Sequence, residues 1–120
     1  MAKVVKFGGS SLASAEQFEK VGSIIRAEKE RRFVVPSAPG KRFKEDTKVT
    51  DMLYACYDLA EKGKDFSQAL DEIKKRYDEI IKGLGLTLSL EDEFKTIDCL
   101  WSYLRNNTVI CNSYCKGRQQ

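Results

Sequence analysis

The chain has 120 residues, 42% of them apolar and 32% charged, which is the balance of a soluble globular domain and not of a disordered chain. Its 21 basic and 18 acidic residues are interleaved and leave a net charge of only +3, so the sequence gives little electrostatic support for nucleic acid binding. It contains no histidine, which excludes histidine-based acid–base catalysis and Cys/His zinc sites.

The location of the protein follows from its apolar segments. No apolar run approaches the ~18 residues that a membrane-spanning helix needs. Residues 1–3 lead directly into a predicted strand, without the apolar segment of a signal peptide. We therefore expect a cytoplasmic protein that does not bind membranes.

The first predicted element is a strand that ends in a glycine-rich loop, Val4-Val5-Lys6-Phe7-Gly8-Gly9-Ser10-Ser11. Glycines at a strand end permit positive φ angles and a close approach of a ligand to the backbone. Their N–H groups, two serine hydroxyls and the Lys6 ammonium are the kind of donors that phosphate oxygens bind. The structural alternative is a tight turn with Lys6 in solvent. The loop is not a Walker loop, because G-x-x-x-x-G-K-[ST] does not occur.

A helix and a second strand follow this loop. Ser14 and Gln17 have the form of a capping box, and apolar residues at helical spacing predict a helix over about 15–31. These apolar residues are Phe18, Val21, Ile24 and Ile25. Phe33-Val34-Val35 is a short strand ended by Pro36. A strand, a helix and a strand within 35 residues predict a parallel βαβ unit.

The remainder of the chain is predicted to be helical. After a charged loop over 41–48, helices are expected from Thr50 to about Gly63, from about Ser67 to Gly83, and after a Ser89 cap. Two parallel strands cannot form an α/β sheet with both faces buried, since such sheets usually have several more strands. The predicted elements therefore look like the front part of a larger fold.

Three segments in register carry a family resemblance. Residues 6–11 look like the K-F-G-G-[ST]-S opening of aspartate kinase, and residues 34–40 are similar to its V-V-x-S-A-x-G segment. Residues 48–53 resemble its K-V-T-D-x-L segment, at the start of the next helix. The resemblance is strong over residues 1–53 and continues more loosely to Ile97.

The resemblance implies a fold and an activity. The fold class would be α/β, a partial amino-acid kinase fold in which a βαβ opening of a parallel sheet precedes a helical layer. The activity would be ATP-dependent phosphorylation of the aspartate β-carboxylate, the first step of lysine, threonine and methionine biosynthesis. Mg²⁺ bridging the β- and γ-phosphates would complete the charge neutralisation, and no residue of this chain is predicted as a metal ligand.

The resemblance also implies site residues. Lys6 would be the catalytic cation, while Ser37 and Thr50 would contact aspartate. The residues that bind the ATP phosphates would be Lys6, Gly8, Gly9 and Ser10. Each has a structural alternative: Lys6 in an ion pair, Ser37 as a turn residue and Thr50 as an ordinary helix cap.

The end of the sequence departs from the family. From about Asp98 the expected G-E-x-x-[SA] motif is missing, and the composition changes abruptly. We expect 1–97 to be the N-terminal part of an amino-acid kinase domain and 98–120 a divergent tail, truncated or out of frame. Three tail cysteines without histidine do not fill a tetrahedral metal site.

Two other functions remain as alternatives. One is a glutamate or acetylglutamate kinase of the same fold, against which the K-V-T-D-x-L segment argues. The other is a non-catalytic module that binds an anion or a nucleotide. On any of these readings the chain by itself is expected to be an incomplete, inactive fragment, and its open sheet edges predict self-association into a homo-oligomer.

Overall fold

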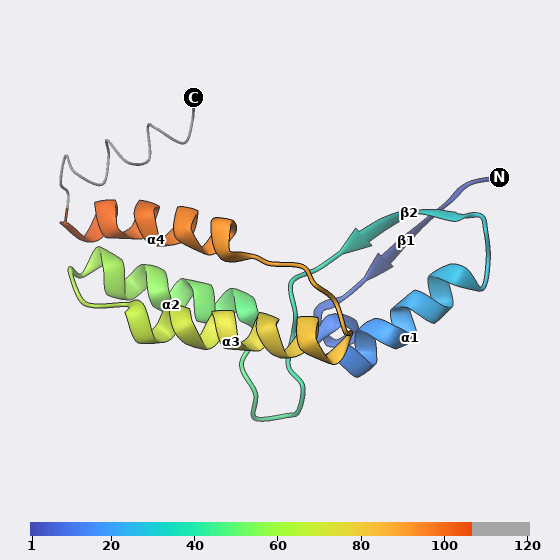
Figure 1. Ribbon diagram of the computed structural model, residues 1–120, viewed down its shortest axis with the longest axis horizontal. Helices are drawn as coiled ribbons and strands as arrows, with labels where there is room; N and C mark the ends of the chain where they lie inside the picture. The colour runs from blue at the N-terminus through green and yellow to red at the C-terminus, as the bar shows by residue number, and fades with distance from the viewer. Residues whose placement is uncertain (107–120) are drawn as a thin grey trace. The chain divides into compact units, whose positions relative to one another are not determined.

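The computed structural model describes residues 1–106 (Figure 1), and these form two compact units. Unit 1 comprises residues 1–51 and 76–87. Unit 2 comprises residues 52–75 and the described residues from 88 onward. Two of the three boundaries fall inside helices, α2 (Val49–Glu61) and α3 (Ser67–Gly83), and the third follows Thr87, after α3 has ended. Residues 107–120, the greater part of the predicted tail, lie outside the described residues.

Unit 1 is built on two parallel strands. β1 (Lys3–Phe7) pairs with β2 (Arg31–Pro36), and α1 (Ala15–Arg26) connects them. Phe7 lies opposite Pro36, so both strands end at the same edge of the sheet. The predicted α/β class and parallel βαβ unit are confirmed. The helix is shorter than the expected 15–31, because the turn before β2 takes residues 27–30 and the strand begins at Arg31.

The start of α1 differs from a complete capping box. The Ser14 hydroxyl accepts a hydrogen bond from the Gln17 backbone N–H at 3.4 Å, as expected for an N-cap. The Gln17 side chain, however, uses its amide N–H₂ to donate to the carbonyl of Ser10 at 3.3 Å, and no bond from the Ser14 backbone N–H to the Gln17 side chain is among those of the described residues. Ser10 belongs to a short 3₁₀ turn, η1 (Gly9–Leu12), so Gln17 ties this turn to α1.

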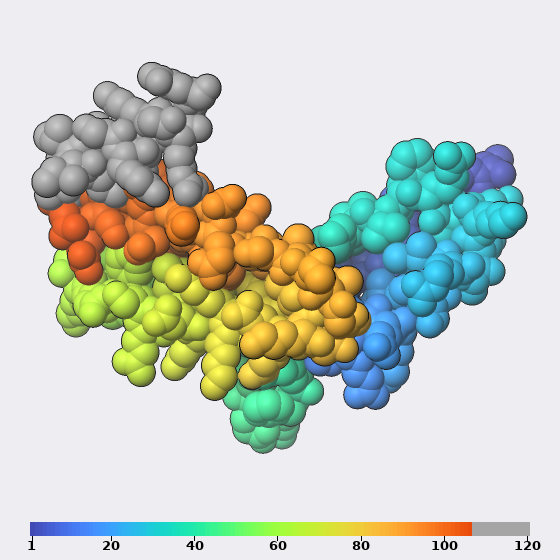
Figure 2. Space-filling model, viewed as in Figure 1, coloured from blue at the N-terminus to red at the C-terminus, as the bar shows by residue number. Residues whose placement is uncertain are grey.

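The strands keep much of their apolar surface exposed. Val4 is 69% exposed and Phe33 59%, and Val34 and Val35 are also exposed. In Figure 2 the β2 residues, in cyan, lie at the surface of unit 1. The buried apolar residues of this unit are instead Leu12, Ala13, Val21, Val49 and Ile80. The two strands thus leave sheet surface uncovered, as their number predicts.

Two loops meet where β1 and β2 end. Ser37 N–H donates to the Phe7 carbonyl at 3.1 Å, and Gly40 N–H donates to the Gly9 carbonyl at 2.8 Å. A Cβ added to Gly40 would lie 2.6 Å from the Gly9 carbonyl carbon, which no real contact allows. Among the described glycines only Gly63 and Gly85, both at helix ends, have positive φ, so the glycine loop does not use the positive φ that glycine permits. Glycine is required here because two backbones touch.

The charged loop over 41–48 is closed by a forked ion pair. Arg42 Nε lies 2.7 Å from Asp46 Oδ2, and Arg42 Nη2 lies 3.1 Å from Oδ1. These hydrogen bonds from Arg42 hold the pKa of the Asp46 carboxyl well below its usual range. The loop leads into α2 at Val49, whose N–H donates to the Pro39 carbonyl at 3.0 Å. Thr50 therefore lies within the first helical turn and is not the N-cap that the sequence suggested.

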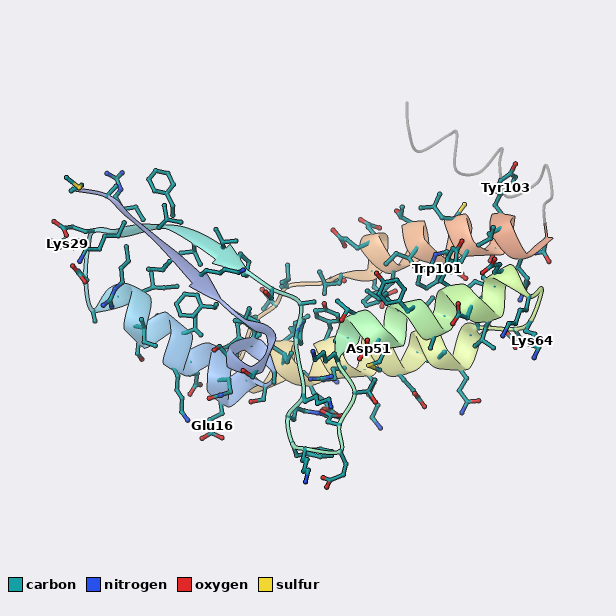
Figure 3. The ribbon with its side chains drawn as sticks, turned by 180° about the vertical axis from the view of Figure 1, so that it is seen from behind. Glu16, Lys29, Asp51, Lys64, Trp101 and Tyr103 are labelled. Atoms are coloured by element: carbon teal, nitrogen blue, oxygen red, sulfur yellow. The ribbon has the colours of Figure 1, made fainter. Side chains whose placement is uncertain are left out.

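Unit 2 is a helical layer with an aromatic centre. Phe66, Ile73 and Cys56 are fully buried, and Cys56 is a free thiol. The Phe66 and Trp101 rings meet edge to face with centroids 5.9 Å apart. Figure 3 shows Trp101 projecting between α4 (Glu91–Asn106) and α2, and Tyr103 pointing away from them.

The predicted helices of this layer are largely confirmed. α3 occupies the predicted range 67–83, and the Ser89 hydroxyl accepts a hydrogen bond from the Glu91 N–H at 3.3 Å at the start of α4. α4 continues through Asp98 to Asn106 without a break. Within residues 1–106, every helix falls short of the length or the apolar character needed to cross a membrane.

The contact between Gly9 and Gly40 predicts a selective effect of alanine. Gly40→Ala should lower the free energy of unfolding by about 1–3 kcal/mol, because its Cβ would force the two loops apart. Gly8→Ala is the matched control, since no atom lies within 4 Å of its added Cβ and its φ of −77° suits alanine. Urea unfolding followed by circular dichroism measures both. Equal stabilities of the two variants would contradict the prediction.

The Arg42–Asp46 pair predicts a pH-dependent contribution to stability. Because the folded-state pKa of Asp46 is below its unfolded value of about 4, its contribution is present above about pH 4 and is lost as the pH falls through the folded-state pKa. Asp46→Asn should therefore lower the free energy of unfolding by about 1–2 kcal/mol at pH 7 and by progressively less in acid. Glu45→Gln, which removes an exposed carboxylate from the same loop, should change it by less than about 0.5 kcal/mol at pH 7. A constant difference between wild type and Asp46→Asn from pH 7 down to strong acid would contradict this assignment.

Candidate functional site

A cavity of about 510 Å³ lies in unit 1, at the edge where β1 and β2 end. We call it the loop cavity, and three segments form its walls: the glycine loop, the turn after β2 and the start of α2. Its lining residues are Gly9, Ser10, Ser37, Ala38, Pro39, Gly40, Lys41, Lys48 and Thr50. The shared end of the two strands is what brings the first two segments together.

The loop cavity gathers four of the residues predicted from the sequence, namely Gly9, Ser10, Ser37 and Thr50. Two predicted residues, Lys6 and Gly8, are not among its described lining residues. Lys6 lies on β1 opposite Val35 with an exposed side chain, and Gly8 is exposed at the start of the loop. The roles of all six in catalysis and binding stay predictions.

The charge of the loop cavity comes from two lysines that the sequence reasoning did not assign. Lys41 follows the turn after β2, and Lys48 directly precedes α2. Lys41 is the first residue of the charged loop over 41–48, while Lys48 is the first residue of the K-V-T-D-x-L segment, which was the signal available for it. The described lining residues include no carboxylate, so the cavity is cationic.

The start of α2 adds to the positive character of this wall. The first backbone N–H groups of a helix carry partial positive charge and bind anions. The hydrogen bond from Val49 N–H to the Pro39 carbonyl fixes this helix end against the turn. Thr50, in the first turn, then presents a hydroxyl to the cavity.

The donors of the loop cavity suit an anion and not a metal ion. Hydroxyls, ammonium groups and backbone N–H groups bind phosphate or carboxylate oxygens, whereas Mg²⁺ requires oxygen ligands such as carboxylates. Throughout residues 1–106, no three side chains of His, Cys, Asp or Glu lie close enough together to hold a metal. Any Mg²⁺ at this site would have to be held largely by the ligand.

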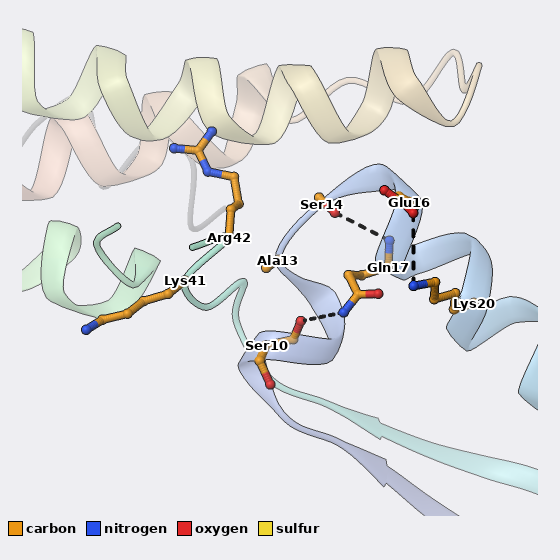
Figure 4. A pocket seen from close by; sticks show the side chains of 8 residues that line it. All are labelled: Ser10, Ala13, Ser14, Glu16, Gln17, Lys20, Lys41 and Arg42. Carbon is orange, nitrogen blue, oxygen red and sulfur yellow. Dashed lines mark hydrogen bonds and ion pairs between the residues drawn. The ribbon is translucent and has the colours of Figure 1, made fainter. Parts of the chain in front are cut away.

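A second hollow of about 390 Å³ lies beside the first, next to the start of α1 (Figure 4). Most of its polar groups already have partners. Lys20 Nζ lies 4.0 Å from the Glu16 carboxylate, and Gln17 donates to the Ser10 carbonyl. Arg42, on its far wall, is held by Asp46. The loop cavity is therefore the better candidate for a ligand site.

Behind the loop cavity lies a buried arginine, Arg76 of α3, which is only 4% exposed. Its Nη1 donates to the Thr47 carbonyl at 2.6 Å, and its Nη2 donates to the carbonyls of Gly40 and, at 3.3 Å, Ala13. Burial lowers the pKa of Arg76, and the Asp46 carboxylate, 3.7 Å from Nη2, acts in the opposite direction.

Sequence reasoning missed Arg76. The available signal was its spacing: it lies three residues after Ile73 and four before Ile80, on the apolar face of the predicted helix. A charged residue at such a position is unusual because a buried charge requires partners.

Comparison with known proteins agrees with the resemblance seen in the sequence. No family model matches the chain. Aspartokinase 3 of Bacillus subtilis (strain 168) is 43% identical over 93 residues, which are 78% of this chain and 20% of that protein. The crystal structure of the Clostridium acetobutylicum aspartate kinase matches 93% of this chain with a TM-score of 0.77 and 35% identity.

Both matches favour aspartate kinase over the glutamate and acetylglutamate kinases considered above. The chain spans about a fifth of the length of the curated relative and covers 25% of the solved structure. The expected resemblance and the partial amino-acid kinase fold are confirmed. In sequence and in fold, this chain is aspartate kinase-like.

Proposed function

We propose that unit 1 provides anion-binding loops for the ATP-dependent phosphorylation of the aspartate β-carboxylate. The observation that carries this proposal is the loop cavity, which combines Gly9, Ser10, Ser37 and Thr50 with two lysines and, among its described lining residues, no carboxylate. The similarity to aspartate kinases gives the substrate class. The proposal includes a cytoplasmic location and a part in lysine, threonine and methionine biosynthesis.

Phosphoryl transfer to a carboxylate makes few chemical demands on the protein. The β-carboxylate of aspartate has a pKa near 4 and is already ionised at pH 7, so it needs no general base. The absence of histidine from the sequence is therefore compatible with this reaction. What remains for the protein is to position two anions and to neutralise their charge.

The residues of the loop cavity divide between these two anions in our proposal. The backbone N–H of Gly9 and the hydroxyl of Ser10 hold phosphate oxygens of ATP, together with Gly8 at the start of the loop. The hydroxyls of Ser37 and Thr50 hold the carboxylates of aspartate. Lys41 and Lys48 neutralise charge that the neutral donors alone would leave uncompensated.

Lys6 is the proposed catalytic cation. It lies at the end of β1, two residues before the glycine loop, and its exposed side chain carries a compact charge on a flexible stem. An ammonium at this position would stabilise the negative charge of the transferring phosphoryl group. Mg²⁺ enters the proposal bound to the nucleotide phosphates, because the described lining residues offer it no carboxylate.

The open edges of the sheet support a further part of the proposal, self-association into a homo-oligomer. Val4 and Phe33 expose large apolar side chains, and strand edges without partners recruit other strands. We expect the chain by itself to bind ligand without turnover, since it spans a fifth of its curated relative. A module that only binds anions is the alternative, and the two experiments below separate it from the kinase reading.

The loop cavity predicts which residues respond to ligand. Titration of L-aspartate or MgATP into the ¹⁵N-labelled chain should shift the amide resonances of Gly9, Ser10 and Thr50. Lys41→Gln with Lys48→Gln should weaken binding about 5- to 30-fold, which is about 1–2 kcal/mol of charge-assisted contacts. Lys29→Gln with Lys44→Gln makes the same change of net charge with exposed residues outside the cavity lining. If both double variants weakened ligand binding equally, the loss of net charge alone would explain the effect, and the proposed ligand site in the loop cavity would be contradicted.

Specificity for aspartate separates a kinase site from a simple anion site. L-Asparagine, which lacks the β-carboxylate, should produce no shifts at concentrations where L-aspartate saturates. Binding of aspartate and unrelated dicarboxylates with equal affinity would favour the anion-binding module.

A second prediction concerns Lys6. Lys6→Ala should weaken MgATP binding about tenfold, because it removes one charged contact to phosphate. A phosphotransfer assay that traps aspartyl phosphate with hydroxylamine should detect no product from either protein. Turnover by the wild type that vanishes in Lys6→Ala would establish the kinase activity and overturn the expected inactivity. Unchanged MgATP affinity in Lys6→Ala would remove Lys6 from the site.

A further inference from the structure

The buried arginine behind the loop cavity is the feature that the proposed reaction leaves unexplained. Arg76 donates to one carbonyl in each of three chain segments: Ala13 after the glycine loop, Gly40 in the turn after β2, and Thr47 before α2. Gly40 lines the loop cavity, while Ala13 and Thr47 lie in the chain next to the glycine loop and the start of α2, which form its other two walls. We propose that Arg76 is a positioning residue that sets the spacing of the cavity walls, an inference that rests on the proposed function of the cavity.

An arginine is the side chain suited to this task. Its guanidinium carries five N–H donors in one rigid plane, so a single group can reach carbonyls that lie in different directions. A lysine ammonium concentrates its donors on one atom and cannot span the same three acceptors. The Asp46 carboxylate, 3.7 Å away, supplies the opposite charge, and Arg42 holds that carboxylate in place.

Arg76 is poorly explained as a stabilising core residue. Its Nε is buried without a hydrogen-bond partner among the described residues, which is unfavourable. It lies between Ile73 and Ile80, where an apolar side chain would fill the same space. Because apolar replacements of buried ion pairs are often neutral or stabilising, stability alone does not account for a charge here, and the three hydrogen bonds of Arg76 indicate a role in geometry.

Backbone hydrogen bonds also hold these segments together. Gly40 N–H donates to Gly9, and Val49 N–H donates to Pro39. The peptide group that links Pro39 to Gly40 is thus held by these two backbone bonds, and the next one, which links Gly40 to Lys41, is held by Arg76. Without the guanidinium, the carbonyls of Gly40 and Thr47 would need hydrogen bonds from water, and the chain segments that carry them would separate. The cavity would then lose the preorganisation that ligand binding requires.

Hydrogen exchange of the whole chain, followed by NMR, tests this role without any ligand. In Arg76→Lys the amides of Gly40 and Val49 should exchange at least tenfold faster, while the amides of α4 keep their wild-type rates. Arg76→Gln should show a larger effect at the same two amides. Arg105→Lys is the matched control, because Arg105 of α4 lies over the Phe66 ring and pairs with Asp65 in unit 2. It should leave both amides unchanged.

A binding measurement then tests whether the spacing of the cavity walls set by Arg76 affects ligand affinity. Inorganic pyrophosphate is the probe, and its affinity should fall about tenfold in Arg76→Lys at a temperature where circular dichroism shows the variant fully folded. If Arg76→Gln does not fold, Arg76→Lys alone decides the question. Unchanged exchange at Gly40 and Val49, or affinity loss only in proportion to the unfolded fraction, would overturn the proposal.

The two measurements separate this inference from the proposed function. If the wild type does not bind pyrophosphate but exchange at Gly40 and Val49 still responds to Arg76→Lys, the proposed function fails and the positioning role stands. If pyrophosphate binds and exchange does not respond, the positioning role fails and the function stands.

Discussion

The parallel register of β1 and β2 is the constraint on which the loop cavity depends. Because Phe7 lies opposite Pro36, the two strands end level, and their following loops leave the sheet at one edge. The contact between Gly9 and Gly40 is possible only from this starting point, and it brings the glycine loop against the turn that carries Ser37. A shift of one residue in either strand would separate the two loops and abolish the cavity.

Charge is distributed around this contact in two layers. Toward the cavity, Lys41 and Lys48 stand without a carboxylate among the described lining residues, so their charge is available to a ligand. Behind it, Arg76 and Arg42 share Asp46, and Arg42 also pairs with Glu79, so two carboxylates compensate their charge within the protein. In the proposed function the outer layer binds the anion, while the inner layer holds the backbone in place.

Local signals predicted most of the fold. The spacing of the apolar residues and the glycine at the end predicted the range of α3 correctly. The order strand, helix, strand predicted that β1 and β2 pair in parallel. Gln17 was expected to complete a capping box by accepting from the Ser14 N–H, but its amide N–H₂ instead donates to the Ser10 carbonyl, which only the folded turn brings close. The sequence showed that the glycines permit positive φ or a close approach of a ligand, but not that Gly9 would contact Gly40, a residue distant in sequence. The role of Arg76 could not be predicted for the same reason, because the three carbonyls to which it donates are remote from it in the sequence.

The closed interior of unit 2 has a chemical consequence. Cys56 is fully buried, and burial raises the pKa of its thiol, so little of the reactive thiolate is present near neutral pH. An alkylating reagent can reach this sulfur only when α2 separates from its neighbours. The rate at which an alkylating reagent labels Cys56 therefore reports how often this helical layer opens, so the thiol is a built-in probe of local unfolding.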